Sequence, residues 1–373
     1  MTRRRNRFEE VMDDVGVDLL VAYGGDRVGT AVQWISEWPV TREAALVVSP
    51  GEQDILLVQH YNHLPNARRV ARSADVRWGG PSTFDTLISI LHERRARRIG
   101  VVGPLRFDAH QRLHSEMGEV VPLDRQYTQL RLVKSDEELD RLRHAARLSD
   151  AAVKAVAEGV EPGMDERALA ALAQGAYLGQ GGTNHVHYFA VTSMSDPRMC
   201  VPAQFQSDRL IQQGDVLFCE ISANYWGYAG QVLRTFTVAA DPEKLFVRLH
   251  DTAEAAFTAI TAVARGGAHV RELVEASSVI EEKGFTIYDD LVHGYGGGYL
   301  PPVLGSASRD HRPIPDMHLE EGMALVVQPN VITPDERAGV QTGELGFITA
   351  DGWVSPHDTP HGMRRIGDPG PSR

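Results

Sequence analysis

The chain has 373 residues and a mass of 41.1 kDa, a length that predicts two domains. Apolar residues make up 42% of it and charged residues 24%, proportions typical of a folded globular protein, so wholesale disorder is excluded. A formal net charge of −12 argues against partners such as nucleic acid or an anionic membrane, and no apolar run approaches the length of a membrane span.

Helical and strand patterns alternate over the first third of the chain. Helices are predicted over residues 6–16 and 83–95, and strands over residues 18–23, 44–49, 55–58 and 98–102. Pro50 and Gly51 separate the second and third strands as a hairpin turn would. This order predicts an N-terminal α/β domain over residues 1–132.

A second domain is expected over residues 133–373. It opens with Ser135 as the N-cap of a long amphipathic helix over residues 139–158, with acidic residues in the first turn, where the helix dipole favours them. Two stretches then occur twice: residues 163–169 resemble residues 267–273, and residues 214–220 resemble residues 322–328. The repeat predicts two similar halves with a cleft between them, although short matches of common residues can also arise by chance.

The two cysteines, Cys200 and Cys219, are too few for a disulfide framework or a thiolate zinc site, which indicates a reduced, cytoplasmic protein. Charged residues follow the N-terminal arginines where a signal peptide would have an apolar core, so none is expected. Cys219 adjoins Glu220 on a predicted strand and is interpreted as a core residue.

Several segments together resemble the pita-bread family of creatinase, aminopeptidase P, prolidase and methionine aminopeptidase. They occur in the family's order, at residues 131–138, 214–220, 227–236, 293–296, 321–323, 328–329 and 348–352. The resemblance implies an α/β N-terminal domain followed by an α+β pita-bread domain with an internal pseudo-two-fold repeat. It also implies a homodimer whose N-terminal domains help to close the partner's site.

The family usually binds two divalent metals with two Asp, one His and two Glu. Carried over to this chain, these positions fall on Glu220, Gln231, His293, Gln328 and Gly343, with Glu344 one residue from the last. One residue along a strand means the opposite face, so Glu344 would reach the cleft only through a bulge at Gly343. Two divalent ions need anionic oxygen ligands, and glutamine is a neutral and poor one, so a catalytic metal pair is not expected. A weak single-metal site stays open.

Two further histidines of the family peptidases are also missing here, because their positions fall on Pro202 and Leu300. The chain is in this respect similar to creatinase, the family member that works without metal. The catalytic histidine of creatinase lies near the Pro202 position, so its mechanism does not transfer intact. Polar candidates near that position are Gln204, Gln206, His185 and His187.

Glu220 and His293 are the expected acid–base pair, with Glu344 as a second candidate base; the structural alternative is that Glu220 is a relic held by hydrogen bonds. Gln231 and Gln328 are expected to hold a neutral amide, urea or lactam, or else only to pack. His185 and His187, at alternate positions of a strand, should share one face, where they could shuttle a proton or bind a metal; a structural role for each is the favoured alternative. Tyr228 and Tyr295 would provide apolar walls. Arg234 would bind a carboxylate of the substrate or form a structural ion pair.

These residues predict a metal-independent, creatinase-like hydrolase. It would cleave a C–N bond of a small polar molecule (an amide, lactam, amidine or urea) with Glu220 or Glu344 activating water and His293 donating the proton. No cofactor is expected, and the only partners expected are the substrate and a second copy of the chain. Two alternatives stay open: a lyase or isomerase that uses the same pair, and a pseudopeptidase that only binds its ligand.

Overall fold

The computed structural model describes residues 2–309 and 313–368, which divide into two compact units, Met1–Arg131 and Leu132–Arg373. The boundary expected from the sequence, after residue 132, lies one residue later. Each unit has its own sheet and its own apolar core.

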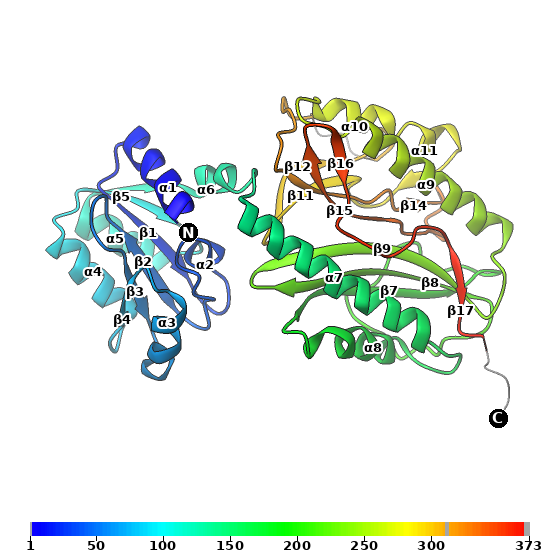
Figure 1. Cartoon of the computed structure of the whole chain (residues 1–373), viewed down its shortest axis with the longest axis horizontal. Coiled ribbons are helices and arrows are strands. Elements are labelled where there is room, and N and C mark those ends of the chain that lie inside the picture. The colour runs from blue at the N-terminus through cyan, green and yellow to red at the C-terminus, as the bar shows by residue number, and fades with distance from the viewer. Residues whose placement is uncertain (1, 310–312, 369–373) are drawn as a thin grey trace. The chain divides into compact units, whose positions relative to one another are not determined.

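The N-terminal unit is a six-stranded mixed sheet between two layers of helices (Figure 1). Alternate strand residues separate the two cores: Leu20 and Leu46 pack with α1 and α2, whereas Val21 and Val47 pack with α4 and α5. The strand order is β4-β3-β2-β1-β5-β6. Its elements are α1 (Thr2–Val15), β1 (Leu19–Gly24), α2 (Thr30–Ser36), β2 (Ala44–Val48), β3 (Ile55–Val58), the 3₁₀ helix η1 (Tyr61–His63), α3 (Leu64–Val70), β4 (Asp75–Trp78), α4 (Thr83–Glu93), β5 (Arg98–Val102), α5 (Phe107–Met117), β6 (Glu119–Pro122) and α6 (Asp124–Leu130).

The predicted elements of this unit are present, including the hairpin of β2 and β3 around Gly51, whose φ is 72°. The first helix was predicted too short: it begins at Thr2, and its buried face begins as early as Arg4, which donates a hydrogen bond to the carbonyl of Trp34. A buried arginine does not contribute to an apolar periodicity, so the pattern missed this first turn.

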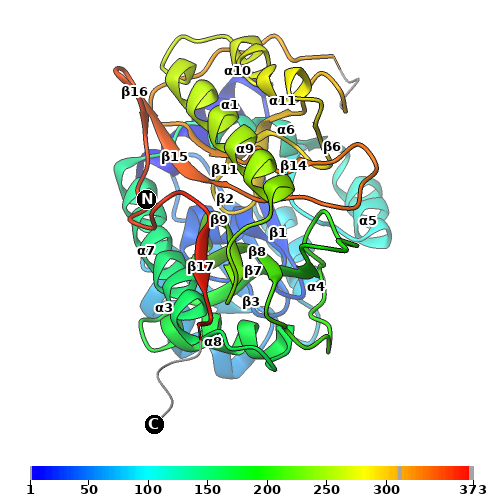
Figure 2. The same ribbon diagram turned by 90° about the vertical axis from the view of Figure 1, so that its right-hand side faces the viewer.

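The C-terminal unit is built on one nine-stranded sheet whose main path is β12-β11-β13-β15-β9-β8-β7. Figures 1 and 2 show α7 and α8 against the β7–β9 half and α9 to α11 against the other half. Its helices are α7 (Asp136–Gly159), α8 (Glu166–Leu178), α9 (Lys244–Val263), α10 (Val270–Ala276) and α11 (Val279–Glu282). Its strands are β7 (Thr183–Ser193), β8 (Asp215–Tyr225), β9 (Tyr228–Val238), β10 (Thr286–Ile287), β11 (Val292–Tyr295), β12 (Tyr299–Leu304), β13 (Ala324–Val327), β14 (Val331–Ile332), β15 (Gly343–Thr349), β16 (Gly352–Val354) and β17 (Arg364–Ile366).

The internal repeat predicted from the sequence has a structural counterpart. Gly163 and Gly267 both have positive φ angles, 97° and 84°, just before α8 and α10. The N-cap residues of these two helices, Asp165 and His269, each form an isolated β-bridge to a later segment. Equivalent turns, caps and bridges in the two halves indicate that the repeat is real.

None of the helices in the described part of the chain is both long enough and apolar enough to cross a membrane.

Helix α7 packs directly on the backbone of β9 at Gly230, where an added methyl group would lie 2.3 Å from the backbone nitrogen of Ala146. Gly230→Ala is therefore expected to lower the free energy of unfolding by about 1–3 kcal/mol, because neither backbone can move aside. Gly175→Ala is the matched control: it lies inside α8 with open space around it, so it should be neutral or stabilising by up to about 1 kcal/mol. Urea unfolding measures the free energy of unfolding of both variants. Equal values for the two would contradict the close contact at Gly230.

Candidate functional site

The pleat of the sheet divides the expected site residues between two faces. Ser222 lies opposite Gln231, and Cys219 lies opposite Arg234, so Glu220 and Gln231 point to one face and Arg234 to the other. Helix α7 contacts the sheet at Gly230 and therefore covers the Arg234 face. We call the helix-covered side the outer face and the opposite side the inner face.

The centre of the inner face is a chain of hydrogen bonds through Gln231. Its Nε2 donates to Oε1 of Glu220 at 3.1 Å and to Oε1 of Gln328 at 2.8 Å. Gln231 and Gln328 are 2% and 1% exposed, so these amides are part of the buried interior. One glutamine thus connects Glu220 in one half of the repeat to Gln328 in the other half.

Two carboxylates that were not expected from the sequence, those of Asp289 and Asp290, also lie at this centre. Asp289 and Asp290 lie in the turn between β10 and β11. Nδ2 of Asn330 donates to Oδ2 of Asp289 at 3.0 Å, and Nε2 of Gln328 donates to the carbonyl oxygen of Asp290 at 3.2 Å. The signal in the sequence was the adjacent pair of aspartates three and four residues before His293, in a largely apolar stretch.

His293 is fully buried on the inner face. Its Nδ1 lies 3.1 Å from the carbonyl oxygen of Gly294, which fixes the proton on Nδ1. Its Nε2 forms no hydrogen bond among the described residues; Oδ2 of Asp290 lies 4.0 Å away and Gln328 is near. The ring stacks on Tyr299, with 3.9 Å between centroids, and meets the edge of Tyr295 at 5.3 Å. The nitrogen that remains free carries a lone pair and can accept a proton.

Burial and neighbouring charges raise the pKa values of the carboxyl groups in this centre, whereas burial lowers the pKa of its histidine. Burial, together with the charges of Asp289 and Asp290, raises the pKa of Glu220 to about 8. Burial and the charge of Asp290 raise the pKa of Asp289 to about 7, and burial lowers the pKa of His293. At neutral pH, Glu220 is therefore mostly protonated and His293 is neutral.

Glu344 and Arg234 do not reach this centre, which corrects the expectation for both. Glu344 pairs with Val232 and so lies on the outer face, where Nη2 of Arg234 contacts its Oε2 at 2.5 Å. Gly343 has a φ of 140° but Glu344 keeps its ladder position, so no bulge turns its carboxylate inward. Arg234 also donates to the carbonyl oxygens of Gly343, Thr359 and Pro360. The structural alternative for Arg234 is the one observed.

The outer face has its own charge cluster around His361. Nδ1 of His361 lies 3.1 Å from Oε2 of Glu254, and its Nε2 lies 3.2 Å from Oε2 of Glu344. Burial alone would lower the pKa of His361, but the hydrogen bonds to Glu254 and Glu344 raise it to about 9. Burial alone would raise the pKa of Glu344, but His361 and the charge of Arg234 lower it to about 2.

This cluster predicts a pH dependence of stability. His361 has a higher pKa in the folded state than its unfolded value of about 6.5, so its contribution is complete below pH 6.5 and is lost as the pH rises through about 9. His361→Gln should therefore cost stability at pH 6 and progressively less toward pH 9.5. Denaturant unfolding of wild type and variant at both pH values measures this difference, in which the titration of Glu220 cancels. A variant at the exposed His318 is the control, and a pH-independent difference would contradict the cluster.

His185 and His187 point to different faces, which corrects the expectation that they share one. The register of β7 against β8 shifts between Asn184 and Val186, so His185 lies in a bulge. His187 is opposite Ile221 and buried on the outer side, where its Nε2 lies 2.9 Å from the hydroxyl of Tyr177. The ring of His185 instead meets the edge of Tyr295 at 6.3 Å. Of the two histidines, only His185 lies on the inner face, near the site.

The other three expected binding residues, Tyr295, Tyr228 and Gln204, lie in three different places. Tyr295 is 1% exposed and lies against His293 on the inner face. The hydroxyl of Tyr228 donates to Oε1 of Glu138 in α7, so this tyrosine is on the outer face and not a wall of the site. Gln204 is exposed in the loop between β7 and β8.

The residues present do not fit the metal pair that the family resemblance implies. Three of the five ligand positions hold Gln231, Gln328 and Gly343, and the NH₂ group of Gln231 points between the oxygens that a cation would need. An N–H donor repels a metal ion where a carboxylate would bind it. Over residues 2–309 and 313–368, no group of three or more His, Cys, Asp or Glu side chains is arranged to hold a metal.

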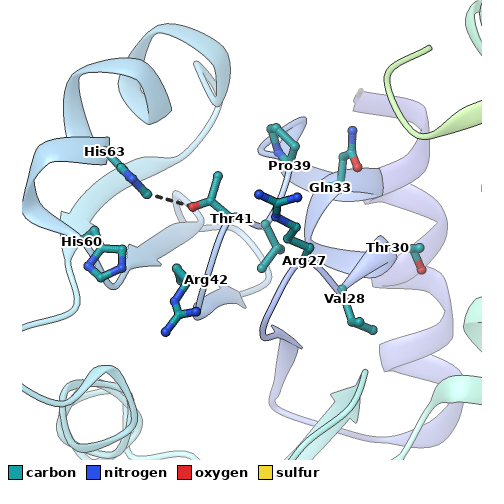
Figure 3. A pocket seen from close by; sticks show the side chains of 11 residues that line it. Arg27, Val28, Thr30, Gln33, Pro39, Thr41, Arg42, His60 and His63 are labelled. Atoms are coloured by element: carbon teal, nitrogen blue, oxygen red, sulfur yellow. Dashed lines mark hydrogen bonds between the residues drawn. The ribbon is translucent and has the colours of Figure 1, made fainter. Parts of the chain in front are cut away.

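The N-terminal unit has a separate pocket of about 840 Å³ (Figure 3). His60 and His63 approach it from one side and Val28, Thr30 and Gln33 from the other, and the hydroxyl of Thr41 lies 2.9 Å from Nδ1 of His63. None of the site residues expected from the sequence lines this pocket. The acid and base groups described above all belong to the C-terminal unit.

Comparison with known proteins gives one family. Residues 140–350 match the model of the metallopeptidase family M24. The Xaa-Pro dipeptidase of Pyrococcus furiosus is 27% identical over 272 residues, which cover 72% of this chain and 75% of that protein. The probable dipeptidase PepE of Mycobacterium tuberculosis is 30% identical over 242 residues, 62% of this chain and 60% of that one.

Solved structures share the fold along nearly the whole chain. The Xaa-Pro dipeptidase from Bacillus anthracis superposes with a TM-score of 0.84 at 20% identity, over 98% of this chain and 99% of that one. The prolidase from Pyrococcus horikoshii gives a TM-score of 0.82 at 20% identity, over 97% and 99%. The two-part architecture expected from the resemblance is confirmed.

Proposed function

Since the chain belongs to the metallopeptidase family M24 and is an enzyme of that hydrolase family, we propose that it hydrolyses a C–N bond without metal ions. The observation that carries the proposal is the bridge of Gln231 to Glu220 and Gln328, which puts amide groups where the family resemblance implies metal ligands. The substrate is a small amide, lactam, amidine or urea. The names of the relatives, dipeptidases that act on one kind of C–N bond, support the reaction type.

The pKa shifts exchange the roles that the sequence suggested for Glu220 and His293. Neutral His293 takes a proton from water through its free Nε2, and the oxygen of that water adds to the carbon of the C–N bond. Protonated Glu220 then gives its proton to the leaving nitrogen as the bond breaks. One water is consumed: its OH is added to carbon, nitrogen gains the proton of Glu220, and the proton taken up by His293 returns to Glu220, which restores both groups. Gln231 and Gln328 hold the polar group of the substrate in this arrangement.

Metal analysis and a substrate panel test the proposal together. Purified protein is expected to contain far less than one transition-metal ion per chain and to keep its activity in EDTA. The panel contains Xaa-Pro dipeptides, lactams, cyclic amidines and ureas, and ¹⁸O-labelled water identifies hydrolysis by mass spectrometry. Two stoichiometric metal ions that are required for turnover would overturn the proposal, and a product without ¹⁸O would point to a lyase or isomerase.

Two further parts of the proposal have separate grounds: the homodimer rests on the resemblance, and the cytoplasmic location on the small number of cysteines. We propose a homodimer, which sedimentation at several protein concentrations tests. A cytoplasmic location stays a prediction. Both cysteines are free and buried, which is compatible with a reducing compartment.

A further inference from the structure

The pocket of the N-terminal unit gathers positive charge in a chain that is acidic as a whole. Arg27, Arg42, His60 and His63 line it, and none of the described residues that line it is an aspartate or a glutamate. The whole chain, by contrast, has a formal net charge of −12. A cavity that is lined by one sign of charge and has low-dielectric walls focuses its field on a ligand, so this pocket favours anions.

Arg27 occupies a backbone position that is unfavourable for a side chain. Gly25 and Val28 exchange two backbone hydrogen bonds of 2.8 Å, so Asp26 and Arg27 are the central residues of a tight hairpin turn. Their φ angles are 48° and 68°, and a turn with positive φ at both central positions strongly prefers glycine at the second. An arginine there adds steric strain, and strained residues of this kind concentrate at functional sites.

The two arginine side chains are available to a ligand. Over residues 2–309 and 313–368, the guanidinium of Arg27 forms no ion pair and no hydrogen bond. Arg42 has an acidic neighbour, Asp26, at 3.4 Å, but the two side chains are 60% and 85% exposed. Water and salt screen such a surface pair, so a bound anion can compete with it for Arg42.

The rest of the lining suits an organic molecule rather than a bare ion. The rings of His60 and His63 meet edge to face with 5.1 Å between centroids, and Val28 and Pro39 add apolar surface (Figure 3). The hydroxyl of Thr41, 2.9 Å from Nδ1 of His63, orients one of these rings. The volume of about 840 Å³ is far more than a phosphate ion fills, and it lies within the range of pockets that bind organic ligands.

Guanidinium groups match phosphate oxygens in geometry as well as in charge. Two parallel N–H donors of one arginine bind two oxygens of a phosphoryl group, and a second arginine can bind the third oxygen. We propose that the N-terminal pocket binds a small organic phosphate, with its phosphoryl group held by Arg27 and Arg42 and its organic part against the histidine rings and the apolar wall. This site is independent of the proposed hydrolysis, because Glu220 and His293 belong to the other unit.

Phenyl phosphate is the probe for this site. Benzyl alcohol, benzoate and inorganic phosphate are its comparisons, because they remove the charge, the phosphoryl group and the organic part in turn. NMR titrations of the full chain, in a buffer free of other phosphates and at low ionic strength, are expected to show phenyl phosphate binding at least about tenfold more tightly than each of the three. The affinity should fall as salt is added, because salt screens the exposed arginines.

Arg27→Gly should weaken the binding of phenyl phosphate about tenfold or more, since one of the two guanidinium groups is lost. Urea should unfold this variant at no lower concentration than wild type, because glycine relieves the strain of the turn. Arg95→Gly is the matched control: Arg95 also has a positive φ, of 53°, but it is exposed and lies outside the pocket, so the affinity should stay unchanged. Glu220→Gln should also leave the affinity unchanged, because Glu220 belongs to the other unit.

Undetectable binding of phenyl phosphate, equal binding of phenyl phosphate and benzyl alcohol, or an unchanged affinity in Arg27→Gly would each refute the proposal. Benzoate that binds as tightly as phenyl phosphate would overturn the assignment of a phosphoryl group. An equal loss of affinity in Arg95→Gly would show a general effect of charge, and a loss in Glu220→Gln would place the anion in the hydrolytic site instead. If Arg27→Gly is less stable than wild type, Arg42→Met replaces it, with the same expected loss of affinity.

Discussion

Glu220→Gln is expected to remove nearly all turnover and, at alkaline pH, to make the protein more stable. As the proposed general acid, Glu220 should contribute about 10²–10⁴-fold to kcat on the substrate that the panel identifies. Glutamine keeps the shape and the hydrogen bond with Gln231 but has no proton to give. The exposed Glu158→Gln in α7 is the matched control and should keep full activity.

The stability change follows from the raised pKa of Glu220. A carboxyl group with a folded pKa of about 8 and an unfolded value near 4.3 contributes stability that is complete below pH 4.3 and is lost as the pH rises through 8. Glutamine does not titrate, so the variant should gain on wild type by up to ~3 kcal/mol between pH 6 and pH 9. Chemical denaturation at both pH values measures this. A constant difference, or an active variant, would show that Glu220 is not a buried acid.

The same assignment predicts a bell-shaped pH profile for the wild-type enzyme. Activity should rise as His293 loses its proton, at a pH below the ordinary histidine value, and fall as Glu220 loses its proton near pH 8. Asp290→Asn removes one of the charges that raise the pKa of Glu220, so the alkaline limb should move to lower pH.

Arg234→Met is expected to be the most destabilising single change outside the site, by about 3–5 kcal/mol. The guanidinium is 2% exposed, pairs with Glu344 and donates to the carbonyl oxygens of Gly343, Thr359 and Pro360. Methionine has a similar volume but leaves these backbone oxygens without their donor and removes from the buried Glu344 carboxylate one of its two positively charged partners, the other being His361. Urea unfolding followed by circular dichroism measures the loss.

Arg198→Met provides the comparison for this prediction. Arg198 is 79% exposed and pairs with Asp196 at the surface, so its loss should cost less than about 1 kcal/mol. If the two variants were equally stable, Arg234 would not hold the outer face together. If Arg234→Met folds normally but loses activity, its role would be in the site after all.

The sequence by itself determined the family, several elements of the fold and part of the centre of the site. Periodicity, turn residues and the Ser135 cap located the helices α1, α4 and α7 and the strands β1, β2, β3 and β5, because these signals act over a few neighbouring residues. The order of short motifs located Glu220, Gln231, His293 and Gln328, and strand alternation correctly separated Cys219 from Glu220. The missing metal ligands were also visible, since they depend only on which residue type occupies a position.

Only the tertiary structure decided which side chains share the site. One inserted residue in β7 separated His185 from His187, and strand register placed Arg234 and Glu344 on the helix-covered face. Asp289 and Asp290 belong to the site but lie in a turn, where no helical or strand periodicity could have predicted their position. The exchange of acid and base roles also came from the structure, because a pKa depends on burial and on charges that are distant in the sequence.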